Sequence, residues 1–174
     1  GTQRSGPRLE SPLLNPQTRS LVRHAHAIAR EVGASAVMLQ GDIVEADGDL
    51  NSLVEDVNFR VILISRRGNV RIPEHYADLC QVARVPDLPM TRAGQIRVAT
   101  LVAASHGMVH SGDRIVCLCG LDRSGVLDTI FVFDLGEELQ VLPRAAGQPL
   151  PSDVDGAVFQ RLLTTAGAIA TQGR

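Results

Sequence analysis

Residues 60–65 have the sequence Arg60-Val61-Ile62-Leu63-Ile64-Ser65, the clearest strand in the first half of the chain. Four consecutive apolar side chains, bounded by polar residues, are typical of a buried strand. A second apolar run, AVML at residues 36–39, follows a glycine turn signal and suits a buried strand of a parallel sheet. The two runs predict a sheet that is at least partly parallel.

Helical patterns alternate with these strands. Asn15-Pro16 resembles an N-cap followed by proline at the first helical position, apolar residues then recur at helical spacing, and Gly33 ends the segment. Residues 47–57 form an acidic segment with one apolar face, which predicts a second helix before the strand at 60–65. The order helix, strand, helix, strand predicts an α/β fold.

The second half continues the alternation. We predict a short helix over residues 73–79, a strand over 81–85, and a long helix from Thr91, as N-cap, to Gly107. Two strands at 114–119 and 128–133 are joined by the turn-rich segment 120–125, so they predict an antiparallel pair. The predicted architecture is therefore an α/β three-layer sandwich, a mostly parallel sheet with an antiparallel edge pair.

The chain divides into four predicted parts. Residues 1–14 are a polar, flexible tail, either a native linker or partly a cloning remnant, and residues 15–142 form the α/β domain. Residues 143–152 are a linker rich in proline and glycine, and residues 153–174 contain a last amphipathic helix.

Composition restricts the functional classes. The formal net charge is −2 and all seventeen cationic residues are arginine, so the chain lacks the basic field of a nucleic-acid-binding protein and any lysine-dependent chemistry. Three cysteines, an odd number without a disulfide framework, indicate a reducing compartment, so we expect a cytoplasmic protein. Neither a signal peptide nor a run of roughly 18 apolar residues is found, so no membrane association is expected.

No catalytic or metal site can be assigned from the sequence. The motifs for a nucleophile elbow, a phosphate-binding loop and a dinucleotide-binding loop are missing at the strand-to-helix junctions. His106 and His110 suit a helix end better than a metal site, and Cys117 and Cys119 should point to one face of a strand as buried packing residues. The acidic residues after the first strand favour a solvated loop over a divalent-ion site; they are Asp42, Glu45, Asp47 and Asp49.

A ligand site is the best remaining candidate. Thr91, Arg92 and Gln95 open the strongest helix, where free helical amides and an arginine could hold a phosphate or carboxylate. The alternative is a simple N-cap with Arg92 paired to an acidic neighbour. The turn after the strand at 114–119 could line the same pocket, although turn chemistry alone also explains its polar residues, among them Gly120, Asp122, Ser124 and Asp128.

Two stretches resemble the carboxy-terminal domain of pyruvate kinases. They are SLVRHAHAIAREVGASAVML, similar to the helix and first strand of that domain, and HGMVHSGDRIVCLCG, similar to its helix, Gly-Asp turn and hydrophobic strand. The resemblance spans most of residues 18–135 and implies a pyruvate-kinase-like fold and a regulatory pocket. The chain departs from the family's Thr-x-x-Gly-x-Thr-Ala signature, which is replaced by Gln40-Gly41-Asp42-Ile43-Val44. Pyruvate kinase activity is not implied, because the catalytic barrel is missing.

A third stretch, VFQRLLTTAGAIATQGR at residues 158–174, resembles the leading helix of diadenylate cyclase domains (DisA_N or DAC-domain proteins, archaeal-type and bacterial). Members of that family make cyclic di-AMP from ATP, and ATP and a divalent metal would belong to a cyclase domain downstream of this chain. Asp155-Gly156-Ala157 spells one catalytic signature of the family, but it precedes the leading helix and lacks its Arg-His-Arg partner. We therefore expect no cofactor for this segment.

Together these features predict a non-catalytic sensor or assembly domain of a diadenylate cyclase. Its expected partners are a small anionic metabolite, the attached cyclase domain and further copies of itself in a homo-oligomer. Two alternatives remain at this point. One is a purely structural oligomerisation module, and the other is a small-molecule enzyme with its site at the Thr91-Arg92 and Gly120–Asp128 loops, although no base or nucleophile is evident there.

Overall fold

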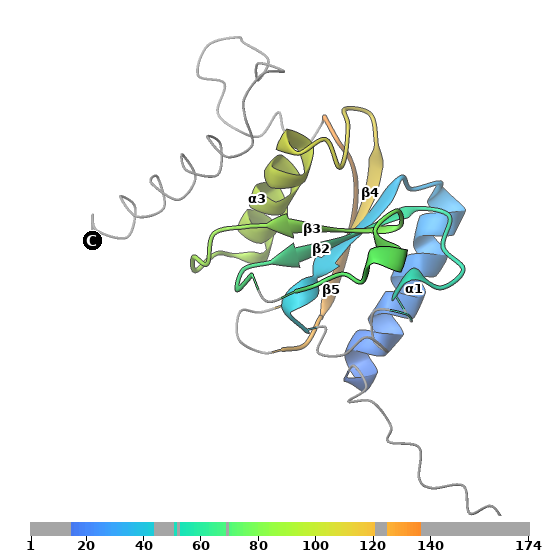
Figure 1. The fold of residues 1–174 in the computed structure, drawn as a ribbon, viewed down its shortest axis with the longest axis horizontal. Coiled ribbons are helices and arrows are strands. Elements are labelled where there is room, and N and C mark those ends of the chain that lie inside the picture. The colour runs from blue at the N-terminus through green and yellow to red at the C-terminus, as the bar shows by residue number, and fades with distance from the viewer. Residues whose placement is uncertain (1–14, 44–50, 52, 69, 121–124, 137–174) are drawn as a thin grey trace, which may run out of the picture.

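The computed structural model describes residues 15–43, 51, 53–68, 70–120 and 125–136. Their strands form one five-stranded sheet in the order β3-β2-β1-β4-β5 (Figure 1). The first four strands are parallel, and β5 runs antiparallel to β4. The strands are β1 (Ala36–Gln40), β2 (Arg60–Ser65), β3 (Cys80–Arg84), β4 (Arg114–Cys119) and β5 (Thr129–Asp134). The mostly parallel sheet with an antiparallel edge pair confirms the predicted fold class.

Both long helices begin and end where local chemistry places their caps. In α1 (Pro16–Val32), the Asn15 side chain accepts a hydrogen bond from the Gln17 amide at 2.9 Å, and Gly33 ends the helix with φ of 65°. In α3 (Arg92–Ser105), the Thr91 hydroxyl accepts from the Gly94 amide at 3.1 Å, and Gly107, just past the helix end, has φ of 67°. A glycine tolerates this left-handed conformation because it has no Cβ.

The two helices cover opposite faces of the sheet, which makes three layers (Figure 1). Successive residues of a strand point to opposite faces. Val37 and Leu39 of β1 therefore join the apolar cluster under α1, whereas Ala36 and Met38 join the cluster under α3. All four side chains are essentially inaccessible to solvent, as expected for a parallel strand covered on both sides.

Three predicted elements differ in detail. The expected helix at 73–79 is only a 3₁₀ turn (Glu74–Tyr76), which has no buried residue to hold a longer helix. The strand β3 begins at Cys80 and not at 81, and the amide of Val61 already bonds to the Leu79 carbonyl at 2.8 Å. The strand β5 begins one residue later than predicted and extends to Asp134.

Other predicted segments lie wholly or partly outside the described residues. Asn51, Leu53 and Val54 of the predicted helix at 47–57 are helical, and Leu53 and Val54 are buried. The tail, the linker at 143–152 and the helix within 153–174 are not described. No helix in the described ranges has the length and apolar character needed to cross a membrane.

Candidate functional site

The sheet changes its winding direction beside β1. From β1 the chain adds β2 and then β3 on one side, whereas β4 lies on the other side. In open α/β sheets, ligands bind at the carboxyl ends of the strands where this reversal occurs, because the connections diverge there and leave a crevice. The reversal here lies between the carboxyl ends of β1 and β4, at Gln40 and Cys119.

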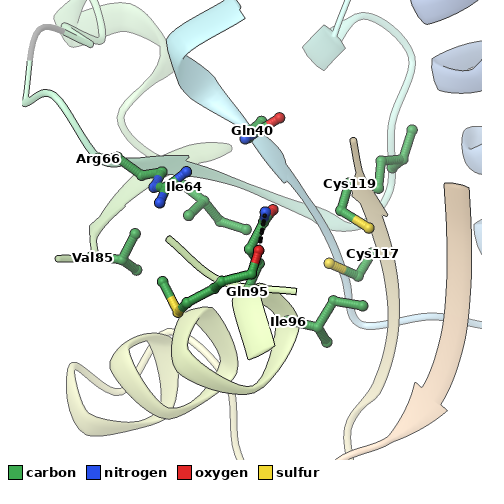
Figure 2. Close-up of a pocket in the computed structure, with 10 residues that line it drawn as sticks. Gln40, Ile64, Arg66, Val85, Gln95, Ile96, Cys117 and Cys119 are labelled. Carbon is green, nitrogen blue, oxygen red and sulfur yellow. Dashed lines mark hydrogen bonds between the residues drawn. The ribbon is translucent and has the colours of Figure 1, made fainter. Parts of the chain in front are cut away.

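A cavity lies at this position, between the sheet and the start of α3 (Figure 2). Side chains of β1, β2, β4 and α3 line it, together with the segment that follows β3; among them are Gln40, Ile64, Arg66, Met90, Gln95 and Cys119. Its volume is about 20 Å³, which is room for about one water molecule. A metabolite could enter only if lining side chains moved.

One of the residues expected to bind a ligand lines this cavity, and three others lie within two positions of a lining residue in the chain. Gln95 lines it, and its side-chain amide lies 3.4 Å from the Met90 carbonyl as a donor (Figure 2). Thr91 and Arg92 begin the same helix, and Gly120 directly follows the lining residue Cys119. Asp122 and Ser124 lie outside the described residues.

Arg92 is paired with Asp128, which precedes β5. The guanidinium donates two hydrogen bonds to the carboxylate, from Nε at 2.9 Å and from Nη2 at 2.5 Å. The hydrogen bond from Arg92, followed by one from the Thr129 hydroxyl, lowers the pKa of Asp128, and the same pairing raises the pKa of Arg92. The structure thus shows the capped helix with a paired Arg92 that the sequence offered as the alternative. An anionic ligand would have to compete with Asp128.

Gly120 is required by packing. A Cβ placed there would lie 2.0 Å from the Val126 carbonyl oxygen, so any other residue would force the backbone apart. The close approach brings residues 126–128 back over the end of β4, where the Asp128 amide bonds to the Cys119 carbonyl at 3.0 Å. Gly120 therefore shapes the site through the path of the chain.

Arg66 is a site residue that the sequence analysis did not identify. It follows β2, lines the cavity, and has only 11% of its side chain exposed. Its guanidinium donates to the Leu88 carbonyl and lies 3.5 Å from the Asp87 carboxylate. The pair Arg66-Arg67, directly after the clearest strand, was the available signal. A cation this deeply buried at the carboxyl edge is well placed for an anion.

Asp42 corrects the prediction of a solvated acidic loop. Its carboxylate accepts hydrogen bonds from the Ser65 hydroxyl at 2.9 Å and from the Arg66 amide at 2.8 Å, so it ties the end of β1 to the end of β2. Asp42 positions the backbone of Arg66, whereas Glu45, Asp47 and Asp49 lie outside the described residues.

The two cysteines of β4 are buried in the fold, and the two histidines lie close to other protein groups. Cys117 and Cys119 lie on the α3 face of β4, as predicted, and burial raises the pKa of both thiols (Figure 2). His106 Nδ1 lies 2.9 Å from the Val102 carbonyl oxygen, and His110 Nδ1 lies 3.9 Å from Asp113. Within the described ranges, no three His, Cys, Asp or Glu side chains are grouped to hold a metal ion.

A larger hollow of about 450 Å³ lies at the opposite, amino edge of the sheet. Several polar groups there already hold neighbouring segments together. Arg60 donates to the Met108 carbonyl, and Asp113 accepts from the Ser35 hydroxyl at 3.2 Å and from the His110 amide at 2.8 Å. These contacts join the end of α3 to the start of β2, and the segments that precede β1 and β4 to each other, so we give this hollow a structural role.

The fold is an α/β domain with a mostly parallel sheet, similar to part of a pyruvate kinase. The chain is similar in structure to a pyruvate kinase from Cryptosporidium parvum, with a TM-score of 0.52 and 12% sequence identity over 69% of this chain and 23% of that one. The chain thus spans about a quarter of that enzyme, and the likeness shows the fold. A family model described as "Probable sensor domain DacZ_P" matches residues 17–142. The chain belongs to this family of sensor domains. No curated protein matches it.

Proposed function

We propose that this chain is the non-catalytic regulatory domain of a cytoplasmic diadenylate cyclase of the DisA_N type, and that it controls cyclic di-AMP synthesis by binding a small anion. The match to the DacZ_P sensor family supports the regulatory role. The observation that carries the ligand site is the nearly buried Arg66 beside a cavity at the reversal point of the sheet. ATP and a divalent metal would be bound by the cyclase domain.

The binding mechanism follows from the size of the cavity. An anion larger than water can enter the cavity only if lining side chains such as Met90 or Gln95 move, and an anion that also binds Arg92 must compete with Asp128. The bound and free domains must therefore differ in conformation. A ligand shifts such an equilibrium only by its difference in affinity for the two arrangements. This difference in binding free energy is the most by which the ligand can shift the conformational equilibrium of the attached domain.

Thermal unfolding in the presence of candidate ligands tests the site. The wild type and an Arg92→Ala variant would be melted with a panel of phosphorylated sugars, nucleotides and central metabolites. A ligand at about 100 times its dissociation constant stabilises the folded state by roughly 2.7 kcal/mol, which raises the melting temperature by several degrees. We expect such a rise in the wild type and a smaller one or none in the variant.

Arg97→Ala is the matched control, because Arg97 is an exposed arginine of the same helix. If Arg97→Ala abolished the response as Arg92→Ala does, the effect would reflect general charge and not the proposed site. If no member of the panel stabilised the wild type, the anion site would be withdrawn.

The link to catalysis needs the full-length protein with its cyclase domain. We expect the ligand found by melting to change the rate of cyclic di-AMP formation from ATP, and Arg92→Ala to remove this response while the rate without ligand stays the same. A rate unaffected by the ligand would separate binding from regulation and contradict the sensor role.

A structural assembly module is the second candidate. Two observations favour it: the cavity holds only about one water molecule, and β5 exposes Phe131 and Val132. The third candidate, a small-molecule enzyme, has less support. Cys117 and Cys119 are nucleophilic side chains that line the cavity, and burial raises the pKa of both thiols, which disfavours the reactive thiolate.

A further inference from the structure

The outer edge of β5 is unusually apolar. Phe131 and Val132 are 38% and 46% exposed, and Leu79 at 41% is the one other large apolar residue this exposed among the described residues. The two side chains of β5 point to opposite faces, because they are adjacent in a strand. Neither face of this strand is fully covered, although β5 itself is paired with β4 along its whole length.

Edge strands are normally protected against further pairing by proline, inward charges, bulges or lysine. Residues 129–134, TIFVFD, contain no proline, glycine or basic residue. The two acidic residues at its ends, Asp128 and Asp134, are each neutralised by a bidentate arginine, Arg92 and Arg114. The other edge strand, β3, differs, since it contains Gln81 and ends in the exposed Arg84. Within the part of the chain that the structure describes, the edge at β5 therefore lacks the barriers to pairing that its own residues could provide.

We infer that β5 pairs antiparallel with β5 of a second copy of this chain, about a twofold axis at Phe131, and so joins the two five-stranded sheets into one. In an antiparallel pair, residues directly opposite each other point to the same face of the sheet. A twofold axis that relates two copies of one strand must therefore pass through a residue and not between two residues. With the axis at Phe131, Ile130 lies opposite Val132 of the second copy, and Thr129 lies opposite Phe133. Large apolar side chains then cover one another across the strands.

The charges at the strand ends agree with this register. Asp128 of one copy comes to lie opposite Asp134 of the other, and each carboxylate brings its own arginine at 2.5–2.9 Å. The result at each end is a group of two carboxylates and two guanidinium groups with balanced charge. An axis at Val132 would instead place Ile130 opposite Asp134, an apolar group against a carboxylate. The apolar side chains that cover one another in this register favour a second copy as the occupant of this edge, and the arginine paired with each carboxylate offsets the repulsion between the two facing carboxylates.

Sedimentation equilibrium of the 174-residue chain over a range of concentrations tests the interface. The wild type is expected to dimerise. Val132→Glu, which puts a charge at the centre of the edge, is expected to weaken dimerisation at least tenfold. Leu79→Glu is the matched control, because it introduces the same charge at an equally exposed apolar residue away from β5. Its dimerisation is expected to equal that of the wild type.

Three results would overturn the proposal. They are a wild type that stays monomeric at all concentrations, a Val132→Glu variant that dimerises as the wild type does, and an equal loss of dimerisation in Leu79→Glu. Circular dichroism of each variant shows whether it is folded. For a monomeric wild type, slow hydrogen exchange at the outward amides of β5 would show that the chain covers its own edge.

Disulfide trapping tests the register directly. With the axis at Phe131, residue 131 faces its own counterpart with Cβ atoms about 4.5–5.5 Å apart, so Phe131→Cys should form a crosslinked dimer under mild oxidation. Val132→Cys should not, because its counterpart lies diagonally, about 7–8 Å away. The native thiols of Cys80, Cys117 and Cys119 are buried and should not interfere. Crosslinking of Val132→Cys in preference to Phe131→Cys would refute the proposed axis.

Discussion

At the scale of single residues, His26 is an ionisable group held in apolar surroundings. It lies on α1 with 7% of its surface exposed, its Nε2 has no hydrogen-bond partner, and its ring meets Phe59 edge-on at 5.3 Å. Burial, with a smaller contribution from Arg30, lowers the pKa of His26 from 6.5 to about 4. The folded protein therefore holds His26 neutral where an unfolded chain would protonate it.

The sign of the pH effect follows from this difference. Between pH 6.5 and 4 the unfolded state binds more protons, so the stability contributed by neutral His26 is complete above pH 6.5 and is lost as the pH falls towards 4. We expect a loss of roughly 2 kcal/mol over this interval, measured by urea unfolding at each pH. In His26→Leu this part of the pH dependence should disappear. An unchanged pH profile in the variant would assign the effect to other groups.

Gly120 gives a second prediction at this scale. In Gly120→Ala the new methyl group would meet the Val126 carbonyl oxygen at 2.0 Å, so we expect a loss of roughly 3 kcal/mol of unfolding free energy. Gly94→Ala is the control, because its Cβ would meet nothing closer than 3.4 Å and alanine favours a helix. Gly94→Ala should be neutral or slightly stabilising. Equal melting temperatures for the two variants would contradict this account of Gly120.

At the scale of elements, the capped start of α3 contributes stability that can be measured. Thr91→Ala removes the hydroxyl that accepts from the Gly94 amide, and loss of such a cap costs about 1 kcal/mol. We expect the melting temperature to fall by a few degrees, and Thr91→Ser, which keeps the hydroxyl, to stay close to the wild type. A comparable loss in Thr91→Ser would mean that the methyl group of Thr91, and not its hydrogen bond, stabilises the helix.

Helices and strands could be predicted where the residues that indicate them lie close together in the sequence. The starts and ends of α1 and α3 were expected from Asn15, Gly33, Thr91 and Gly107, because a cap depends on a few neighbouring residues. The helix expected at 73–79 was wrong in kind, because a short segment without a buried face gains little from continuing beyond a single turn.

At the scale of the whole molecule, labelling of the cysteine thiols can show when each of the two apolar clusters opens. Cys80 lies in the cluster under α1 and Cys117 in the cluster under α3. Burial raises the pKa of Cys80 to about 12 and also raises that of Cys117, so neither thiol should react while the protein is folded. If both faces of the sheet open in one cooperative step, both thiols should be labelled at the same rate in increasing urea.

Thiol labelling followed by mass spectrometry of the digested chain measures the two rates separately. A Cys80 rate with a weaker dependence on urea than the Cys117 rate would show that the α1 face opens by itself. That result would contradict a single cooperative unit and would assign α1 to a separate, less stable layer.

Asp128 connects the candidate ligand site with the proposed interface. It is the partner of Arg92 at the candidate ligand site and also the first residue of the proposed interface at β5. A ligand that takes Arg92 would leave Asp128 uncompensated opposite Asp134 of the second copy. Under both proposals, ligand binding should therefore weaken dimerisation, which the same sedimentation experiment can measure with and without the ligand.

The sequence by itself was enough to predict the two long helices, the parallel strands, the antiparallel pair that follows them, and part of the candidate site, but not the short turn at Glu74–Tyr76. Apolar runs, helical periodicity and caps are local properties, so these predictions needed no knowledge of contacts. Thr91, Arg92, Gln95, Gly120 and Asp128 were singled out for the same reason, since they occupy a helix start and a turn. Their role in binding a ligand remains a prediction.

Only the tertiary structure decided which other residues these side chains contact. The strand order brings Arg66, which follows β2, to the cavity beside the ends of β1 and β4, and the passage of residues 126–128 over Gly120 brings Asp128 onto Arg92. The same order leaves β5 at an edge and buries β1 at the centre. Such contacts join segments far apart in the chain and depend on how side chains fill the space between layers, which no local pattern of residues specifies.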